Sequence, residues 1–429
     1  MLAGAGAALA PHIASAASPD PFAIETIAAD LAFLDGQAHL RTGGAGELAL
    51  AARLADRLEA AGFDLSRQAL RAPFFEPRRS ALALDSGEVE ISPQFIVTQT
   101  GPDGIEAPLH FWRLGDDAQL LKDKIAIVML APGRHSQLLA PPSKTSLEAA
   151  LAGAPAAIVL ITEGVTGETI ILNAPFDKPV AAIPIAVLGP KPGSAVIAAA
   201  KEGKRARLII DGEAGWRDSF NLIGRIHRAG ARHVVISTPR TGWTPAVAER
   251  GPGIAAWRAL AAWAPQGLRQ HSLTFISTAA HEFDNAGGLQ FLTSADCPSP
   301  RKTALWLHLG AGFAGRDLHV LPNYLTVPLP SVDAQRFLVG SEEILPILRA
   351  AFAGQPGLEA PYPASAGGAG ELVEVLHAGY RPAFGLLGGH WRHHMMSDRL
   401  AMTDPSWVRA AALAAKSAAE QILNTDRTP

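Results

Sequence analysis

The second half of the chain alternates strand-like and helix-like segments, and two of its strands are continuous, mainly apolar runs. LTFIST (residues 273–278) and ALWLHLG (304–310) lack the regular polar alternation of a half-exposed strand. Strands buried on both faces occur mainly in parallel sheets that helices cover. Helix-like segments follow the strands, such as GIAAWRALAAWA (253–264) and PSWVRAAALAAKSAAEQIL (405–423). We therefore predict an α/β fold with a mostly parallel mixed sheet and helices on both faces.

The first half has a different texture. Residues 23–63 space their apolar side chains as helices do. From about residue 76, short strand-like runs such as KIAIVML (124–130) are separated by Gly, Pro and Asp. We predict a β-rich domain at residues 76–212, inserted into an α/β domain made of residues 20–75 and 213–429. A chain of 429 residues is long enough for two domains.

Composition excludes several classes of protein. Apolar residues make up 48% of the chain and charged residues 18%, which favours a large folded core over disorder. The net charge of −3 gives no reason to expect nucleic acid or an anionic membrane as a partner. A single cysteine, Cys297, excludes an internal disulfide and a Cys-rich metal cluster. Apart from the first 19 residues, no run approaches the ~20 apolar residues of a membrane span.

The first 19 residues resemble a secretory signal. They form an Ala-rich apolar run that contains the small-residue motif Ala14-Ser15-Ala16, although no Lys or Arg precedes Arg41. The alternative is an Ala-rich tail without that role. We predict a signal-like segment at residues 1–19, and with it a periplasmic or secreted location.

A pair of polar residues follows the strand LTFIST. In STAAHEFDNAGGLQF, His281 and Glu282 come directly after the strand and before a Gly-containing turn. Open α/β sheets hold their active sites at the carboxyl ends of their strands. A histidine exchanges protons near neutral pH, and a carboxylate can hold a metal ion. The pair is therefore a candidate for catalysis.

The order of the motifs resembles that of the co-catalytic zinc aminopeptidases, which are relatives of glutaminyl cyclase and the transferrin-receptor ectodomain. The resemblance covers nearly the whole chain, and residues 76–212 look like the protease-associated domain of that family. It implies the α/β fold and a hydrolase of peptide or amide bonds. The motifs that carry it are, in order, FNLIGRI, HVVIST, GPGIAAWRAL, FISTAAHEFDNAGG, LWLHLG and HHMMSD.

Two metal positions of the family are lost in this sequence. In the family, two zinc ions share a bridging carboxylate, and each gains one His and one further carboxylate. The resemblance puts Pro239 where the first His belongs and Gly310 where an Asp belongs, and neither side chain can bind a metal ion. Thr241 replaces an Asp that orients the site. We therefore expect no zinc pair of the usual kind.

Other positions keep a usable side chain. The resemblance puts Glu249 at the bridging position, Glu282 at a ligand position and His394 at the last ligand position, while His281 replaces the catalytic Glu. Glu249, Glu282 and His394 would supply the three ligands of one catalytic zinc ion with an open fourth position. We predict one zinc ion at most, or none, with His281, Glu282 and His394 as catalytic residues. Glu249 at a helix start also fits a helix cap or dipole partner.

Three further residues are candidates for substrate binding. Arg240 lies beside the lost His position, where its guanidinium could also pair with Glu249 in place of a zinc ion, because a buried carboxylate needs a positive partner. Trp243 and Trp391 flank the predicted site and could line a pocket. We interpret His390 and His393 as structural residues.

The sequence leaves several functions open. The first is a divergent hydrolase of small peptides or amides with a remodelled site that lacks the zinc pair. The second is an inactive relative that binds a peptide or a protein. A third is metal-free acid–base or nucleophilic catalysis by His281 with Asp284, Ser277 or Thr278, which only geometry can establish.

Overall fold

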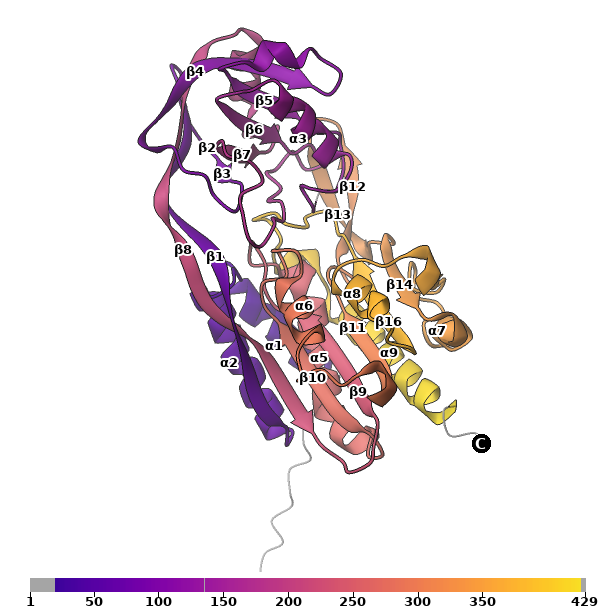
Figure 1. The fold of residues 1–429 in the computed structure, drawn as a ribbon. Helices are drawn as coiled ribbons and strands as arrows, with labels where there is room; N and C mark the ends of the chain where they lie inside the picture. Colours follow the sequence, from indigo (N-terminus) through magenta and orange to yellow (C-terminus); the bar gives the residue numbers. More distant parts are fainter. Residues whose placement is uncertain (1–19, 135, 426–429) are drawn as a thin grey trace, which may run out of the picture.

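The computed structural model describes residues 20–134 and 136–425. Figure 1 shows an α/β lobe, which contains both the first helices and the C-terminal helix, and a smaller lobe built around β4 to β7. The predicted signal-like segment lies outside the described residues. Within those residues, no helix is both long and apolar enough to span a bilayer.

The helices are α1 (Ile24–Asp35), α2 (Ala45–Ala60), α3 (Ser143–Ala152), α4 (Ser194–Lys201), α5 (Val247–Gly267), α6 (Ala286–Leu292), α7 (Leu345–Ala351), α8 (Glu371–His377) and α9 (Pro405–Thr425). The strands are β1 (Asp64–Leu84), β2 (Gly87–Glu90), β3 (Ser92–Pro93), β4 (Gly101–Arg113), β5 (Ile125–Met129), β6 (Ala157–Ile161), β7 (Ile185–Leu188), β8 (Arg205–Ile226), β9 (His233–Pro239), β10 (Ser272–Thr278), β11 (Thr303–Leu309), β12 (Arg316–Leu321), β13 (Leu325–Val332), β14 (Arg336–Gly340), β15 (Tyr362–Pro363) and β16 (Ala383–Gly388).

The centre of the α/β lobe is a parallel sheet. Its strands follow the order β10-β9-β11-β16, and each neighbouring pair is parallel. β8 adds antiparallel to β10 at one side, and β14 adds antiparallel to β16 at the other. The predicted mostly parallel mixed sheet is therefore confirmed. Because the four central strands are parallel, their carboxyl ends meet at one edge of the sheet.

Helices cover both faces of this sheet. On one face α5 packs against α1, α2 and α9, and on the other α6 packs against α8. The apolar strands β10 and β11 are buried along their whole length. Trp257 of α5 is fully buried and donates its indole N–H to the carbonyl of Ile236 in β9. Each large apolar side chain buried in this way contributes about 1.5–3 kcal/mol.

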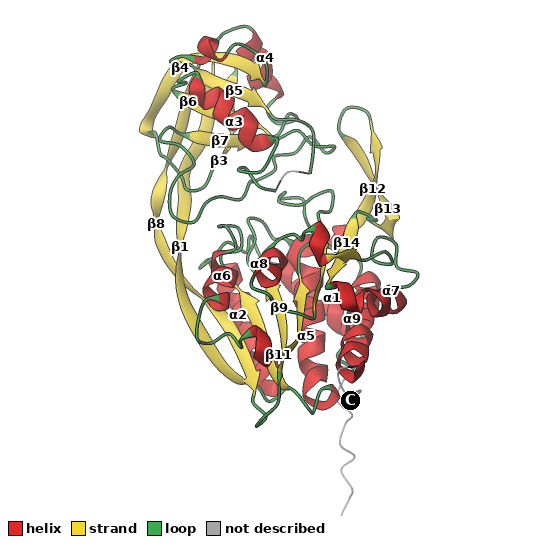
Figure 2. Ribbon diagram, turned by 45° about the vertical axis from the view of Figure 1, so that its right-hand side comes forward, coloured by secondary structure: helices red, strands yellow, loops and turns green. Residues whose placement is uncertain are grey.

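A long antiparallel ribbon connects the lobes. β1 and β8 have 21 and 22 residues and pair from Asp64↔Arg225 to Ala83↔Arg207. Figure 2 shows both strands running from the α/β lobe into the smaller lobe. The predicted domain limits at residues 76 and 212 fall inside these continuous strands, where Pro77 pairs with Gly212 beside a register shift.

Candidate active site

A cavity of about 370 Å³ opens at the carboxyl edge of the parallel sheet. Its walls include His281 after β10, His308 in β11 and His393 in the loop after β16. Arg134 and Asn173 reach the same cavity from the smaller lobe. Both lobes therefore contribute side chains to a site that the sequence places at the strand ends.

Three buried residues turn metal-binding atoms toward one another. Ligand atoms of Glu249, His393 and His394 all lie within 4.8 Å of each other. His394 Nε2 is 3.5 Å from Glu249 Oε1, and His393 Nδ1 is 3.9 Å from Glu249 Oε2. Among the described residues, Glu249 Oε2, His393 Nδ1 and His394 Nε2 have no hydrogen-bond partner, and Glu249 Oε1 has only its ion pair with Arg250. Buried polar atoms without partners are rare in proteins, so this group is a candidate metal centre.

The backbone holds Glu249 and His394 in place. Glu249 lies in the first turn of α5, where the Asp398 carboxylate accepts hydrogen bonds from the backbone N–H groups of Ala248 and Glu249. Asp398, rather than Glu249, therefore caps this helix. His394 has a φ of 60°, a left-handed conformation that costs a non-glycine residue on the order of 1 kcal/mol. The surrounding packing must compensate for that cost.

Hydrogen bonding and burial set the surroundings of the two histidines of this group. His394 Nδ1 lies 2.7 Å from the carbonyl oxygen of Ile171, which can only accept a hydrogen bond. Nδ1 therefore carries a proton, and Nε2 faces Glu249. His393 stacks on His394 with ring centroids 4.1 Å apart, and burial lowers its pKa well below the usual value. A carbonyl behind the imidazole is the common arrangement around a metal-binding histidine.

Arg250 lies beside this group and pairs with two carboxylates. Its Nη2 is 2.9 Å from Glu249 Oε1 and 3.0 Å from Glu282 Oε1, and its Nε donates to the carbonyl of Thr241. All of these side chains are buried. Burial by itself would raise the pKa of Glu249, but the Arg250 guanidinium holds it well below its usual value.

The residues present fit one metal ion and do not fit two. Glu249, His393 and His394 offer three nitrogen and oxygen ligands, the set that a catalytic zinc ion uses. Pro239 ends β9 and Gly310 follows β11, and neither side chain can coordinate a metal ion. A guanidinium fills the space between two carboxylates that a second ion would need.

The predicted role of Arg240 is wrong. Its guanidinium is fully buried and pairs with Glu47, and it also donates to the backbone carbonyls of Phe220 and Ser277. It therefore contacts neither Glu249 nor the cavity. The two arginine side chains point in different directions. Arg240 follows β9 and its side chain points toward β8 and β10, whereas the side chain of Arg250 projects from the first turns of α5. Arg250 takes the role that the sequence suggested for Arg240.

The group that could hold a metal ion contains Glu249 and His394 from the predicted ligand set, but not Glu282. Glu282 is buried, but its carboxylate pairs with Arg250 and lies outside the group that could hold a metal ion. His393, interpreted from sequence as structural, stands in its place. The doublet His393-His394 is the signal that could have found this ligand, because adjacent histidines can converge when the backbone turns sharply, as it does at His394.

His281 is backed by a carboxylate that sequence reasoning missed. Its Nδ1 lies 3.3 Å from Glu371 Oε1, and its backbone N–H donates to Thr241 Oγ1. Glu371 also accepts a hydrogen bond from Thr278 Oγ1 at 2.7 Å. Burial opposes ionisation of Glu371, yet its hydrogen bond with His281 leaves its pKa below the usual value.

Glu371 is the first residue of α8 and follows a glycine-rich loop. An acidic residue at such a position is the sequence signal that could have identified it as a site residue. The partner of His281 is thus Glu371 rather than Asp284. Ser277 and Thr278 belong to β10, and the Thr278 hydroxyl is engaged by Glu371.

His308 is a second residue that sequence reasoning missed. It is fully buried in β11, where Ser237 Oγ lies 3.0 Å from its Nδ1, and its Nε2 has no hydrogen-bond partner in the described parts of the chain. Burial lowers its pKa to about 4, so the ring is neutral at pH 7. The single histidine within the apolar run ALWLHLG is the sequence signal that could have identified His308 as a site residue.

The two tryptophans occupy different surroundings. Trp243 is only 2% exposed, packs against Phe95 and Phe283, and donates its indole N–H to Asn173. It therefore supports a residue of the cavity wall rather than facing a substrate. Trp391 lines a neighbouring hollow of about 330 Å³, and the Arg134 guanidinium stacks over its ring.

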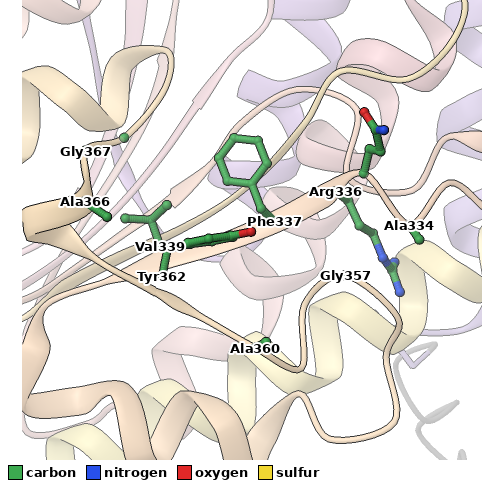
Figure 3. Close-up of a pocket in the computed structure, with 11 residues that line it drawn as sticks. Ala334, Arg336, Phe337, Val339, Gly357, Ala360, Tyr362, Ala366 and Gly367 are labelled. Atoms are coloured by element: carbon green, nitrogen blue, oxygen red, sulfur yellow. The ribbon is translucent and has the colours of Figure 1, made fainter.

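A larger hollow of about 640 Å³ lies beside β14 and β15. Figure 3 shows Phe337, Val339 and Tyr362 gathered there, while the Arg336 side chain extends away from them. Arg336 donates to the carbonyls of Phe313 and Pro356. The described residues in its walls include no histidine and no carboxylate, so the smaller cavity at the strand ends is the better candidate. Phe337 lines both this hollow and the cavity at the strand ends.

Comparison with known proteins finds similarity in structure only. No protein-family model matches the chain, and no curated protein matches its sequence. A zinc aminopeptidase from Bacillus subtilis is 15% identical, with a TM-score of 0.72 over 96% of this chain and 98% of that one.

Two further solved structures resemble the chain over most of its length. A peptidase M28 precursor from Shewanella amazonensis is 16% identical, with a TM-score of 0.69 over 95% of this chain and 93% of its own. An aminopeptidase from Aneurinibacillus sp. strain AM-1 is 16% identical, with a TM-score of 0.64 over 94% of both chains. The protein therefore has the zinc-aminopeptidase-like fold, as the motif order predicts.

Proposed function

We propose that this protein hydrolyses amide or peptide bonds of small substrates at a remodelled centre that holds one metal ion. The aminopeptidase-like fold suggests a peptidase-type hydrolase. The observation that carries the proposal is the buried group of Glu249, His393 and His394, in which one carboxylate oxygen and two imidazole nitrogens have no hydrogen-bond partner in the described chain.

Charge balance supports a bound cation. Around the Arg250 guanidinium lie three buried carboxylates, and this group of four side chains keeps two negative charges. Uncompensated charges are costly in a protein interior. The three carboxylates are those of Glu249, Glu282 and Glu371. A divalent ion at Glu249 would supply the missing charge.

The ligands and the base have separate roles. Glu249, His393 and His394 would hold the ion, which when bound supplies a Lewis acid that polarises a carbonyl and acidifies water. His281 is the group that takes a proton from the attacking water, because its Nδ1 is occupied by Glu371 and its ring lines the cavity. Glu371 orients that ring and stabilises the imidazolium that forms.

A metal assay and an amide screen test the proposal together. Purified protein is expected to contain about one zinc per chain and to hydrolyse at least one of a panel of aminoacyl anilides and other small amides. We expect Glu249→Gln to lose the metal and the activity, and His281→Ala to keep the metal but lose activity. His319→Ala, a change at an exposed residue of β12, is the control.

Two metal ions per chain would contradict the single-ion centre. Absence of turnover with and without added Zn²⁺ would contradict hydrolysis.

A second candidate function is peptide binding without catalysis. The observation that favours it is the ion pair of Arg250 with Glu249 and Glu282, which neutralises part of the centre without any metal. A protein of this kind would bind peptides, turn none over, and bind equally well after the change His281→Ala. Loss of a measured turnover in that variant would exclude it.

A further inference from the structure

We propose that the Nε2–H group of His308 donates a hydrogen bond to the carbonyl oxygen of the substrate and stabilises the oxyanion that forms there. This proposal rests on the hydrolysis proposed above and names a further catalytic residue for it. It concerns a residue outside the candidate metal group, two strands away from His281 in the sheet order β10-β9-β11.

The hydrogen bonds around Ser237 determine which nitrogen of His308 carries the proton. Trp306 Nε1, which can only donate, lies 2.9 Å from Ser237 Oγ. The hydroxyl hydrogen of Ser237 then needs an acceptor, and in the described chain that acceptor is His308 Nδ1 at 3.0 Å. Nδ1 is therefore unprotonated, and in the neutral ring the proton is on Nε2.

The ring of His308 stays neutral at physiological pH. It is completely buried in β11, and burial lowers its pKa to about 4. Glu371 opposes this effect, whereas His281 and Arg250 add to it. A neutral imidazole with its proton on Nε2 has no lone pair to offer a metal ion there. His308 is therefore a donor rather than a ligand.

His308 belongs to the wall of the candidate cavity, and its Nε2 lacks a hydrogen bond to the described residues. Nε2 of His308 is buried and has no partner within residues 20–134 and 136–425, and the ring lines the same 370 Å³ cavity as His281. Gly310, two residues further along the chain, also lines that cavity. An acceptor from a bound molecule is what would complete the bond.

An amide carbonyl is the acceptor that suits this donor. A neutral N–H does not require a charged ligand, and its hydrogen bond strengthens as the carbonyl oxygen becomes negative during attack by water. Preorganised donors of this kind typically contribute 10²–10³-fold to the rate. His281 takes the proton from water on one wall, and His308 contacts the oxygen from another.

The experiment compares His308→Phe, which removes the donor but keeps a planar ring, with His308→Gln, which restores an N–H. We expect kcat on the best small amide to fall by about 10²–10³-fold in His308→Phe with little change in KM, and to recover partly in His308→Gln. His233→Phe is the matched control, because His233 lies at the opposite end of the neighbouring strand with Nδ1 3.0 Å from Thr274 Oγ1. Thermal melting verifies that each variant is folded.

Nitrogen NMR of the imidazole provides a readout that does not need activity. In the protein without substrate we expect a protonated Nε2 and an unprotonated Nδ1 at His308 at pH 7. The opposite tautomer, or a charged ring, would overturn the proposal, and so would a His308→Phe variant as active as the control. Wild-type protein that turns over no amide would overturn hydrolysis itself, and the role of His308 with it.

Discussion

Replacement of Arg250 by Met removes the only guanidinium between Glu249 and Glu282. Met keeps much of the volume of the side chain, so the change tests charge more than packing. Both carboxylates lose a partner within 3.0 Å, and the carbonyl of Thr241 loses its donor. Removing one partner from a buried ion pair costs about 3–5 kcal/mol. That is a large fraction of the roughly 5–15 kcal/mol by which proteins are stable.

The assay is urea denaturation at pH 7 with a chelator present, which gives the free energy of unfolding without bound metal. Two matched variants separate charge from packing. Adding Glu282→Gln to the Arg250→Met variant removes one buried charge that has lost its partner. The free energy of unfolding is expected to rise by at least 1 kcal/mol. Arg258→Met is expected to lower the free energy of unfolding by less than Arg250→Met does. The reason is that Asp30, the partner of Arg258, keeps a second cation, Arg53, at 3.0 Å.

The stability of the Arg250→Met variant is expected to depend on pH in a definite direction. Without the guanidinium, burial raises the folded-state pKa of the stranded carboxylates above their unfolded value. The folded state then binds protons more readily, so the variant regains stability relative to wild type as the pH falls toward 5. A loss below 1 kcal/mol at pH 7, or no recovery with Glu282→Gln, would refute the reasoning.

Three further predictions concern His308, His393 and Glu371. The pKa of His308 lies near 4 in the folded state and at 6.5 in the unfolded state, so the free energy of unfolding falls by about 3 kcal/mol through this group as the pH drops from about 6.5 to about 4. In chelator-treated protein, His308→Asn is expected to flatten this dependence of stability on pH. An unchanged slope would contradict the neutral, buried state of His308. His393→Ala is expected to lose zinc measured by elemental analysis, whereas His377→Ala, at an exposed residue of α8, keeps it. Glu371→Gln should lower kcat by about 10²-fold while metal content stays unchanged, and loss of the metal there would show that Glu371 serves the ion instead.

Much of the fold could be predicted because its signals are local. LTFIST and ALWLHLG became β10 and β11, and the segment from residue 405 became α9. An apolar run buries itself on both faces whatever its partners are, and helical spacing of apolar residues shows in a single segment. The position of His281 at the carboxyl edge of the sheet follows from the same local pattern.

The partners within the site could not be predicted in this way. Arg240 and Arg250 both lie near Glu249 in sequence, but the direction of a strand end and the rotation of a helix decide which of them contacts it. Glu371 meets His281 from 90 residues away, through the packing of α8 on the sheet. Glu282 is adjacent to His281, yet its carboxylate turns to Arg250.

By itself, the sequence determined which segments become strands and helices and at which edge of the sheet the chemistry lies, because backbone hydrogen bonding and apolar burial act over a few neighbouring residues. Only the tertiary structure decided which charges meet there. Buried carboxylates, guanidinium groups and imidazoles interact over a few ångströms, and that proximity is set by how separate elements pack, since no local pattern records it.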